Sequence, residues 1–326
     1  MRLKERLPVL WQAPTQVRVG TDPRWSVVLT DLSPSAVRAL TGLPAGATDR
    51  RIRAALQAEG ASEAEAADVV GHLRAAHLLA RGPLSNHPDA ATLALVEADG
   101  EVEGVLTRRA AACVAVQGLG RLGSALAHTL AVGGVGHLQL DDAAPVTRSE
   151  VGWAGVHATD VGRARGAAVA EALRATGAVA VDGFGADAAD LVVLVEHGVA
   201  DPAGHRVLVT DGTPHLSVVL REASVLVGPL VQPGRTPCLR CLDLHRTDAD
   251  PDWPAIAAQL AVRHPDAEET AVATVGAALG AAHTLAFLDG RPSALAGAAL
   301  EVRLPDVVPR LVRWGAHPDC GCTGLP

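Results

Sequence analysis

The sequence predicts an α/β protein in which a small α+β domain precedes a larger domain with a mainly parallel, Rossmann-like sheet. The length of 326 residues exceeds that of one typical domain and predicts two. Hydrophobic residues make up 48% of the chain and charged residues 20%, a composition that excludes a disordered protein. In the second part of the chain, strand-like apolar runs alternate with helical patterns, which is typical of βαβ units.

A hairpin and three helices are predicted for the start of the chain. Two β-branched runs, QVRVG at 16–20 and WSVVLTDL at 25–32, flank a Thr-Asp-Pro turn and predict an antiparallel pair. Each helical pattern follows a residue suited to cap a helix: 35–41 follows Ser33, 50–58 follows Thr48 and 63–76 follows Ser62. Glu65 lies three residues after Ser62, so these two residues predict a capping box.

This order of elements predicts a winged-helix-like domain over residues 1–82, with the run at 77–81 as a candidate wing strand. A Gly-Pro-Leu-Ser-Asn stretch then interrupts the periodicity and marks a boundary. A linker over 83–109, with one helix over 89–98, leads to the second domain, which is predicted to span 110–326.

The second domain is predicted to begin with a βαβ unit. The stretch at 111–142 has the order strand, glycine loop, helix, Gly-Gly stop, strand and acidic pair. Later segments continue the alternation: helices over 162–176 and 270–288, buried parallel strands at 191–195 and 207–209, antiparallel strands at 216–220 and 224–227, and the strand-like runs LAGAALEVRL and VVPRLVRW.

The glycine loop is a candidate nucleotide site. Gly118, Gly120 and Gly123 form a Gly-x-Gly-x-x-Gly motif between a predicted strand and a predicted helix. The first glycine permits a tight turn, the second lets the backbone approach a phosphate, and the third lets the helix pack on the strand. Asp141 or Asp142, at the end of the next strand, would accept hydrogen bonds from a ribose. The alternative is that these glycines serve only the packing of helix and sheet.

Two close pairs of cysteines predict a metal site. The four residues are Cys238, Cys241, Cys320 and Cys322. Four thiolates suit a tetrahedral Zn²⁺ ion and leave no open coordination position, so the zinc would be structural and would fasten the end of the chain to an earlier loop. The alternatives are a redox dithiol formed by the first pair, or a site in which His245 or His317 replaces one cysteine. Cys113, in a predicted strand, is expected to be a buried apolar residue.

Charge and composition exclude several function classes. A net charge of −8 and a pI near 5.9 argue against a nucleic-acid-binding protein. We expect neither a signal peptide nor a run of about 18 uncharged apolar residues, and therefore a cytoplasmic protein without a membrane span. Asp211, His215 and Ser217 include the residue types of a hydrolytic triad, but no nucleophile elbow surrounds the serine, so we assign no triad.

Several stretches together resemble a known family. They are VAVQGLGRLG, the acidic pair, HATDVGRARGAA, TPCLRCL and the terminal HPDCGC. Over residues 110–326 the chain resembles the ThiF/MoeB-like family, the bacterial relatives of ubiquitin-activating enzymes. The resemblance implies adenylation of the C-terminal carboxylate of a small protein or peptide with ATP and Mg²⁺, a homodimer and a four-cysteine zinc site.

A closer resemblance includes the N-terminal domain. A winged-helix-like module followed by a ThiF-like domain with GPLVQPGRTPCLRCLDLHRTDADPDWP is similar to the proteins that bind leader peptides of azoline-forming peptide precursors. In those proteins the ThiF-like half is often catalytically silent. The resemblance therefore implies a peptide or small protein as the partner.

The active-site positions of the catalytic relatives are altered in this sequence. Where that family has an Asn and an Arg-Gln pair against the phosphates, this chain has Ser149, Glu150 and Trp153. Arg165 replaces the family's lysine, and a planar guanidinium is not equivalent to an ammonium group. His197, beside Glu196, stands where the family has its Mg²⁺-binding aspartate, and a neutral imidazole is a poor ligand for Mg²⁺.

These departures predict a catalytically silent peptide-binding or scaffold protein, and we assign no catalytic residue. The peptide would add as a strand along 25–32, with the helix over 63–76 as the other wall. The alternative is an ATP-dependent adenylyltransferase in which Asp142, Arg163 and Arg165 hold the nucleotide. A nicotinamide-dependent oxidoreductase would share the glycine loop but would leave the cysteine pairs unexplained.

Overall fold

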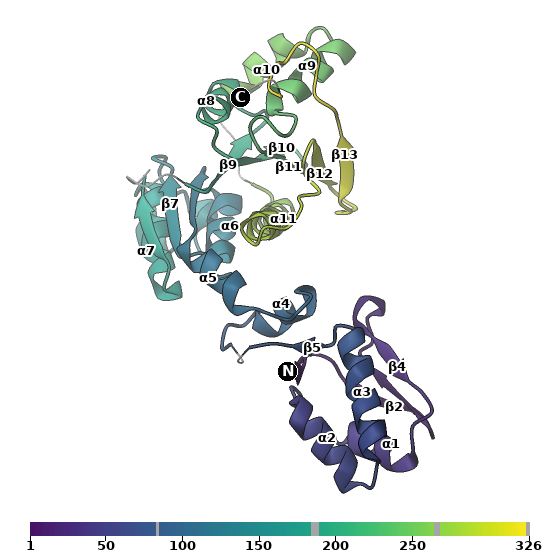
Figure 1. The fold of residues 1–326 in the computed structure, drawn as a ribbon. Coiled ribbons are helices and arrows are strands. Elements are labelled where there is room, and N and C mark those ends of the chain that lie inside the picture. Colours follow the sequence, from purple (N-terminus) through teal and green to yellow (C-terminus); the bar gives the residue numbers. More distant parts are fainter. Residues whose placement is uncertain (83–84, 184–188, 264–267, 324–326) are drawn as a thin grey trace. The chain divides into compact units, whose positions relative to one another are not determined.

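The computed structural model describes residues 1–82, 85–183, 189–263 and 268–323 (Figure 1). The chain divides into two compact units, Met1–Thr107 and Arg108–Pro326. The division falls inside helix α5 (Glu103–Ala111), which the sequence did not predict. Pro83 and Leu84, at the predicted domain boundary, lie outside the described residues.

The predicted helices of the first unit begin at their predicted caps. They are α1 (Pro34–Thr41), α2 (Asp49–Ala58) and α3 (Glu63–Ala75). The hydroxyl groups of Ser33, Thr48 and Ser62 each accept a hydrogen bond from the first turn of their helix. The predicted capping box is wrong in its second half, because the Glu65 carboxylate accepts from Ser33 N at 2.8 Å and thereby ties α3 to the start of α1.

The first unit contains two small sheets. The strands are β1 (Arg2–Leu3), β2 (Val9–Ala13), β3 (Gln16–Val19), β4 (Val27–Leu29) and β5 (Leu79–Ala80). The predicted hairpin is β3–β4, which β2 extends into an antiparallel sheet with β4 at one edge. The closing strand β5 pairs with β1 instead of the hairpin, so it does not extend this sheet as a wing strand would.

Lys4 is the most deeply buried charged residue of the first unit, with 1% of its surface exposed. Its Nζ donates to the carbonyl oxygen of Glu97 at 2.9 Å, just after α4 (Ala90–Val96). Burial lowers the pKa of Lys4, although the negative charges of Asp99 and Glu97 oppose this effect. The lysine therefore fixes α4 against the N-terminal strand β1.

The second unit contains an eight-stranded sheet in the order β13-β12-β11-β10-β9-β6-β7-β8. Its strands are β6 (Cys113–Gln117), β7 (His137–Asp141), β8 (Val179–Asp182), β9 (Leu191–His197), β10 (His215–Arg221), β11 (Ser224–Val231), β12 (Ala298–Arg303) and β13 (Arg310–Arg313). The four neighbouring pairs from β10 to β8 are parallel. The three pairs from β13 to β10 are antiparallel. The predicted mainly parallel, Rossmann-like sheet is confirmed.

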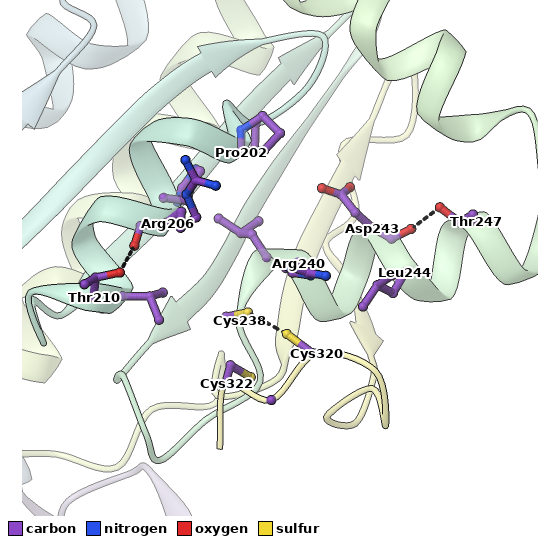
Figure 2. Close-up of a pocket in the computed structure, with 15 residues that line it drawn as sticks. Pro202, Arg206, Thr210, Cys238, Arg240, Asp243, Leu244, Thr247, Cys320 and Cys322 are labelled. Carbon is purple, nitrogen blue, oxygen red and sulfur yellow. Dashed lines mark hydrogen bonds between the residues drawn. The ribbon is translucent and has the colours of Figure 1, made fainter. Parts of the chain in front are cut away.

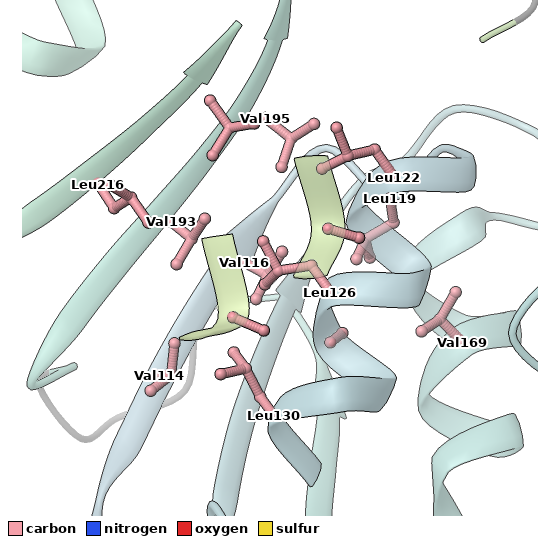
Figure 3. Packing of buried hydrophobic residues seen from close by; sticks show 14 of the residues in the cluster. Val114, Val116, Leu119, Leu122, Leu126, Leu130, Val169, Val193, Val195 and Leu216 are labelled. Atoms are coloured by element: carbon pink, nitrogen blue, oxygen red, sulfur yellow. The ribbon is translucent and has the colours of Figure 1, made fainter. Parts of the chain in front are cut away.

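Helices cover this sheet. They are α6 (Arg121–Val132), α7 (Arg165–Leu173), α8 (Pro202–Thr210), α9 (Leu239–Ala249), α10 (Trp253–Ala261) and α11 (Thr270–Leu288). Figure 3 shows Leu126 and Leu130 of α6 against Val116 and Val114 of the central strand β6. This buried face positions the start of α6, which carries the glycine loop.

Helix α11 lies close to α6 because two glycines of α11 face the leucines of α6. A Cβ atom at Gly276 would lie 2.6 Å from Leu122 Cδ1, and one at Gly280 would lie 2.6 Å from Leu126 Cδ1. The expectation that no long uncharged apolar run occurs is wrong, because Thr270–Leu288 is long and apolar enough to cross a membrane by length and composition alone. The contacts with α6 and the sheet explain its apolar composition as that of a core helix.

A buried ion pair joins the last turn of α5 to the end of α11. Arg109 Nε and Nη2 donate to the two carboxylate oxygens of Asp289 at 2.7 and 2.8 Å, and Nη1 donates to Gly133 O at 2.9 Å. Both side chains are almost completely buried. The Arg109 guanidinium therefore links the C-terminal end of α6 to the C-terminal end of α11.

One predicted strand is a helix. Residues 207–209, predicted as a buried parallel strand, belong to α8. The Asp201 carboxylate accepts hydrogen bonds from Ala203 N and Gly204 N, and Pro202 occupies the first turn, so a standard N-terminal signal preceded the apolar run. Strands β1, β2 and β8 and helices α9 and α10 were not predicted either.

Candidate functional site

The glycine loop connects β6 to α6, and two of its positions, Gly118 and Gly123, leave no room for a side chain. Gly118 has a φ of +82°, and a Cβ atom there would lie 2.2 Å from Val195 O. A Cβ atom at Gly123 would lie 1.8 Å from Gly118 O. The loop therefore brings the start of α6 close to the sheet and directs the first amide groups of the helix outward, an arrangement that binds anions.

The acidic pair after β7 braces this loop. One Asp142 carboxylate oxygen accepts from Leu119 N at 2.7 Å and the other from Ala144 N at 2.9 Å. Asp141 contributes its backbone oxygen to Gly118 N at 3.1 Å and its carboxylate to Gln117 Nε2 at 2.9 Å. Both aspartates lie at the carboxyl end of the parallel strands, where ligands bind in such sheets.

Arg165 lies beside the loop but already has carboxylate partners. Its Nη2 donates to Glu150 Oε1 at 2.5 Å, and its Nη1 lies 3.5 Å from Asp142 Oδ2. Burial opposes the charge, but the bonds to Glu150 and the charge of Asp142 outweigh it and raise the pKa of Arg165. Arg163 pairs instead with Asp160, away from Asp142.

Trp153, one of the residues predicted to replace phosphate-contacting groups, stacks on a cation of the glycine loop. The Arg121 guanidinium lies 4.3 Å from the centre of the Trp153 ring, and Trp153 Nε1 donates to Arg121 O. Within the described chain, the buried Arg121 Nε has no hydrogen-bond partner. Ser149 is exposed, and its hydroxyl lies 2.9 Å from Thr147 Oγ1.

Glu268 is a loop residue that sequence reasoning missed. Its Oε2 accepts from Leu122 N, in the first turn of α6, at 2.6 Å. Its Oε1 lies 3.1 Å from Nε2 of His197, which is the residue that stands where the family has a metal-binding aspartate. Glu196, by contrast, points to α8, where it accepts from Asp201 N and lies 3.0 Å from His205 Nε2.

A cavity of about 620 Å³ begins at Gly198, directly after His197. Its lining includes the guanidinium groups of Arg221 and Arg246 and the ring of Trp253, over which Arg246 lies at 4.7 Å. Burial lowers the pKa of Arg246, and the positive charge of Arg221 acts in the same direction. Both arginines have carboxylates nearby, Glu301 at 3.8 Å from Arg221 and Asp243 at 3.6 Å from Arg246, so the cavity carries charges of both signs.

The four predicted metal ligands lie together. Cys238 and Cys241 lie at the start of α9, and the sulfur atoms of Cys320 and Cys322 lie 3.4 Å from Cys238 Sγ and Cys241 Sγ, respectively. All four sulfurs lie within 4.8 Å of one another, and a tetrahedral zinc with bonds of about 2.3 Å would separate them by about 3.8 Å. The cluster can therefore hold a metal ion.

Cys238, Cys241 and Cys322 are buried, and Cys320 is partly exposed. Burial raises the pKa of Cys322 to about 11, so metal binding at neutral pH must displace protons. Neither histidine alternative replaces a cysteine, because His245 Nε2 bonds to Gly315 O at 3.1 Å and His317 Nε2 lies 2.9 Å from Asp248 Oδ2. These two bonds fasten the C-terminal segment to α9 beside the cluster.

A second cavity, of about 460 Å³, adjoins the cysteine cluster (Figure 2). Its described lining comes from α8, α9 and the C-terminal segment, and includes Cys238, Cys320 and Cys322. Figure 2 shows Arg206 and Arg240 on its two helical walls. None of the lining residues belongs to the glycine loop, so this cavity is separate from the candidate nucleotide site.

The three residues considered for a hydrolytic triad differ in their exposure. His215 and Ser217 are completely buried on β10, and within the described chain neither His215 Nε2 nor Ser217 Oγ has a hydrogen-bond partner. The remaining His215 nitrogen, Nδ1, donates to Thr213 O at 2.9 Å. Asp211 is exposed at the end of α8.

Comparison with solved structures gives full-length matches. The chain is similar to E. coli MccB solved with MccA-N7isoAsn (TM-score 0.72, 17% identity, 100% of both chains covered) and to E. coli MccB solved with ATP (0.70, 16%, 98% of both). It is also similar to PaaA (0.72, 17%, 96% of this chain and 100% of PaaA). No family model and no curated protein matches the sequence. At these identities the likeness establishes the shared fold.

These neighbours contradict the prediction of a catalytically silent scaffold. MccB is described as the microcin C7 biosynthetic enzyme and has been solved with ATP, and with AMPCPP together with MccA. The prediction relied on altered motif residues, whereas the close packing at Gly118 and Gly123 is present in the loop. The alternative prediction, an ATP-dependent adenylyltransferase, is the one these neighbours favour.

Proposed function

We propose that this chain is an ATP-dependent adenylyltransferase of the ThiF-like superfamily that activates the carboxylate of a peptide. The observation that carries the proposal is the close approach of the loop backbone to Val195 at Gly118 and of α6 to the loop at Gly123. This packing directs the first amides of α6 toward a ligand at the carboxyl end of the parallel strands. The full-length likeness to a protein solved with ATP and with a peptide supports it.

The charges around the loop predict that nucleotide binds together with Mg²⁺. The Arg165 guanidinium faces the carboxylates of Asp142 and Glu150. Arg121 donates to the backbone oxygen of Glu268, and the Glu268 carboxylate adds a negative charge at Leu122 N, so the loop has no excess of positive side-chain charge for a triphosphate. Mg²⁺ prefers oxygen ligands and keeps several waters, so phosphate oxygens would supply most of its coordination and His197 would not take part. The ribose would lie near the acidic pair.

The reaction would join the peptide to the α-phosphate. A carboxylate oxygen of the peptide attacks the α-phosphorus, the bond between the α-phosphorus and the bridging oxygen breaks, and pyrophosphate leaves with Mg²⁺. We place the end of the peptide in the cavity that Gly198 lines, because Gly198 directly follows β9 at the carboxyl end of the parallel strands. The protein's part is to position the two reactants and balance their charge.

The first unit is the proposed recognition module for the rest of the peptide. Strand β4 is an edge strand that pairs only with β3 in its sheet, and α3 contacts β4. An added peptide strand would bond to the free edge of β4, as expected for a winged-helix-like module.

We place the reaction in the cytoplasm, where ATP is available and thiols stay reduced. A homodimer remains a prediction.

The test is ATP–pyrophosphate exchange with the full chain. Peptides with a free C-terminal carboxylate should support exchange of labelled pyrophosphate into ATP in the presence of Mg²⁺, and the same peptides with an amidated C-terminus should not. Calorimetric titration with ATP should give Mg²⁺-dependent heat. The absence of nucleotide binding at millimolar ATP, with and without Mg²⁺, would refute the proposal.

A further inference from the structure

A carboxylate of the protein itself occupies the anion position of the glycine loop. Glu268 Oε2 accepts from Leu122 N at 2.6 Å, in the first turn of α6. A Cβ atom at Gly120 would lie 2.2 Å from Glu268 Oε1, so the carboxylate lies against the glycine whose missing side chain allows a phosphate to approach. The Glu268 residue is 9% exposed, and its side chain is therefore inside the site.

The features that hold Glu268 are those that would hold a phosphate. The first amide groups of a helix lack intrahelical partners and form the positive end of the helix dipole, which stabilises a negative group. His197 Nε2, 3.1 Å from Glu268 Oε1, adds a polar partner on the other side. Two anions cannot occupy one such position, so a phosphate group must compete with the Glu268 carboxylate.

Only the side chain of Glu268 has to move to vacate the position. Arg121 Nη1 donates to Glu268 O at 2.7 Å, and Arg121 Nη2 donates to Thr270 Oγ1 at 2.9 Å, where α11 begins. These two bonds hold the segment from Glu268 to Thr270, on the C-terminal side of the carboxylate. Rotation about the side-chain bonds of Glu268 is therefore sufficient to expose Leu122 N.

We propose that Glu268 is an internal competitor of phosphate, which keeps the glycine loop occupied until a nucleotide displaces it. The proposal rests on the proposed function for the identity of the nucleotide, but competition for the anion position does not depend on it. The apparent dissociation constant rises in inverse proportion to the fraction of molecules with the position open. If Glu268 leaves the position open in about one-tenth of the molecules, its removal tightens phosphate binding about tenfold.

The experiment measures binding of inorganic pyrophosphate and of ATP to the full chain by calorimetry. Glu268→Gln keeps the size of the side chain and removes its charge. Glu269→Gln is the matched control, because Glu269 is exposed and its carboxylate accepts from Val272 N of α11 instead of from an amide of the glycine loop. The amide signal of Leu122 in an NMR spectrum reports the same event without any activity measurement, and circular dichroism confirms that each variant is folded.

We expect Glu268→Gln to bind pyrophosphate and ATP about tenfold more tightly than the wild type, and Glu269→Gln to bind as the wild type does. Tighter pyrophosphate binding by Glu268→Gln with no ATP binding to either protein would support the competitor role and refute the proposed adenylyltransferase. Equal or weaker pyrophosphate binding by Glu268→Gln would overturn the competitor role. If Glu268→Gln bound ATP more weakly than the wild type only when Mg²⁺ is present, the competitor role would be overturned and Glu268 would be a Mg²⁺ ligand.

Discussion

Replacing His215 by leucine should remove a specific part of the acid sensitivity of the second unit. The His215 ring is completely buried on β10, Nδ1 donates to Thr213 O, and Nε2 has no partner within the described chain. Burial lowers the pKa of His215 to about 4, and the nearby His205 acts in the same direction. Leucine is close to histidine in volume and cannot take up a proton.

The sign and size of the effect follow from these values. Between pH 6.5 and about 4 the unfolded chain binds a proton at His215 while the folded chain does not, so the free energy of unfolding falls as the pH falls through this window. The full difference between pKa values of 6.5 and about 4 corresponds to about 3 kcal/mol, of which about 1 kcal/mol is lost by pH 5.5. Above pH 7 the ionisation of His215 contributes nothing.

The assay is urea unfolding followed by tryptophan fluorescence at pH 7.5, 6.5 and 5.5. The loss of unfolding free energy from pH 7.5 to 5.5 should be about 1 kcal/mol smaller in His215→Leu than in the wild type. His137→Leu is the control, because His137 is exposed and folding does not remove its ring from water. The same acid dependence in His215→Leu and the wild type would refute the reasoning.

Three further predictions concern the loop, the metal and the core. Gly123→Ala should cost about 1–3 kcal/mol and abolish ATP binding by calorimetry, because its Cβ would lie 1.8 Å from a backbone oxygen, whereas Gly71→Ala, with nothing within 4 Å, should stabilise the chain by about 1 kcal/mol in urea unfolding. Cys322→Ser should lower bound zinc, measured by atomic emission, from one ion per chain toward zero and destabilise the second unit; unchanged zinc content would contradict the four-cysteine site. Arg109→Met should lower the free energy of unfolding by about 3 kcal/mol, because the buried Asp289 carboxylate loses its two-bond partner and keeps Arg291 at 3.4 Å. The double variant Arg109→Met with Asp289→Leu should regain most of the loss.

The parts of the fold that were predicted correctly depend on local signals. The caps Ser33, Thr48 and Ser62 and the glycine loop act within one turn of chain, so their residue types and spacing are sufficient. The strand predicted at 207–209 was wrong because three apolar residues fit either structure, and the helix-starting residues before them were overlooked.

The contacts that define the site could not be predicted in this way. Glu268 meets Leu122 across 146 positions of the chain, and no spacing rule links residues so far apart. Glu65 bonds to Ser33 across 32 positions although a local partner was available. The altered motif positions were visible in the sequence, but the retained backbone geometry of the loop is a property of the packing of α6 on β9, and it appears only in three dimensions.

The burial of Lys4 makes the first unit measurable on its own. Lys4 is the only lysine of the chain, and its amino group is held by the carbonyl oxygen of Glu97. Acylating reagents need an exposed, uncharged ε-amine, so they label this residue only when the contact between the N-terminal strand and α4 opens. The rate of acylation at Lys4, followed by mass spectrometry, therefore reports the local opening of that contact with no background from any other lysine.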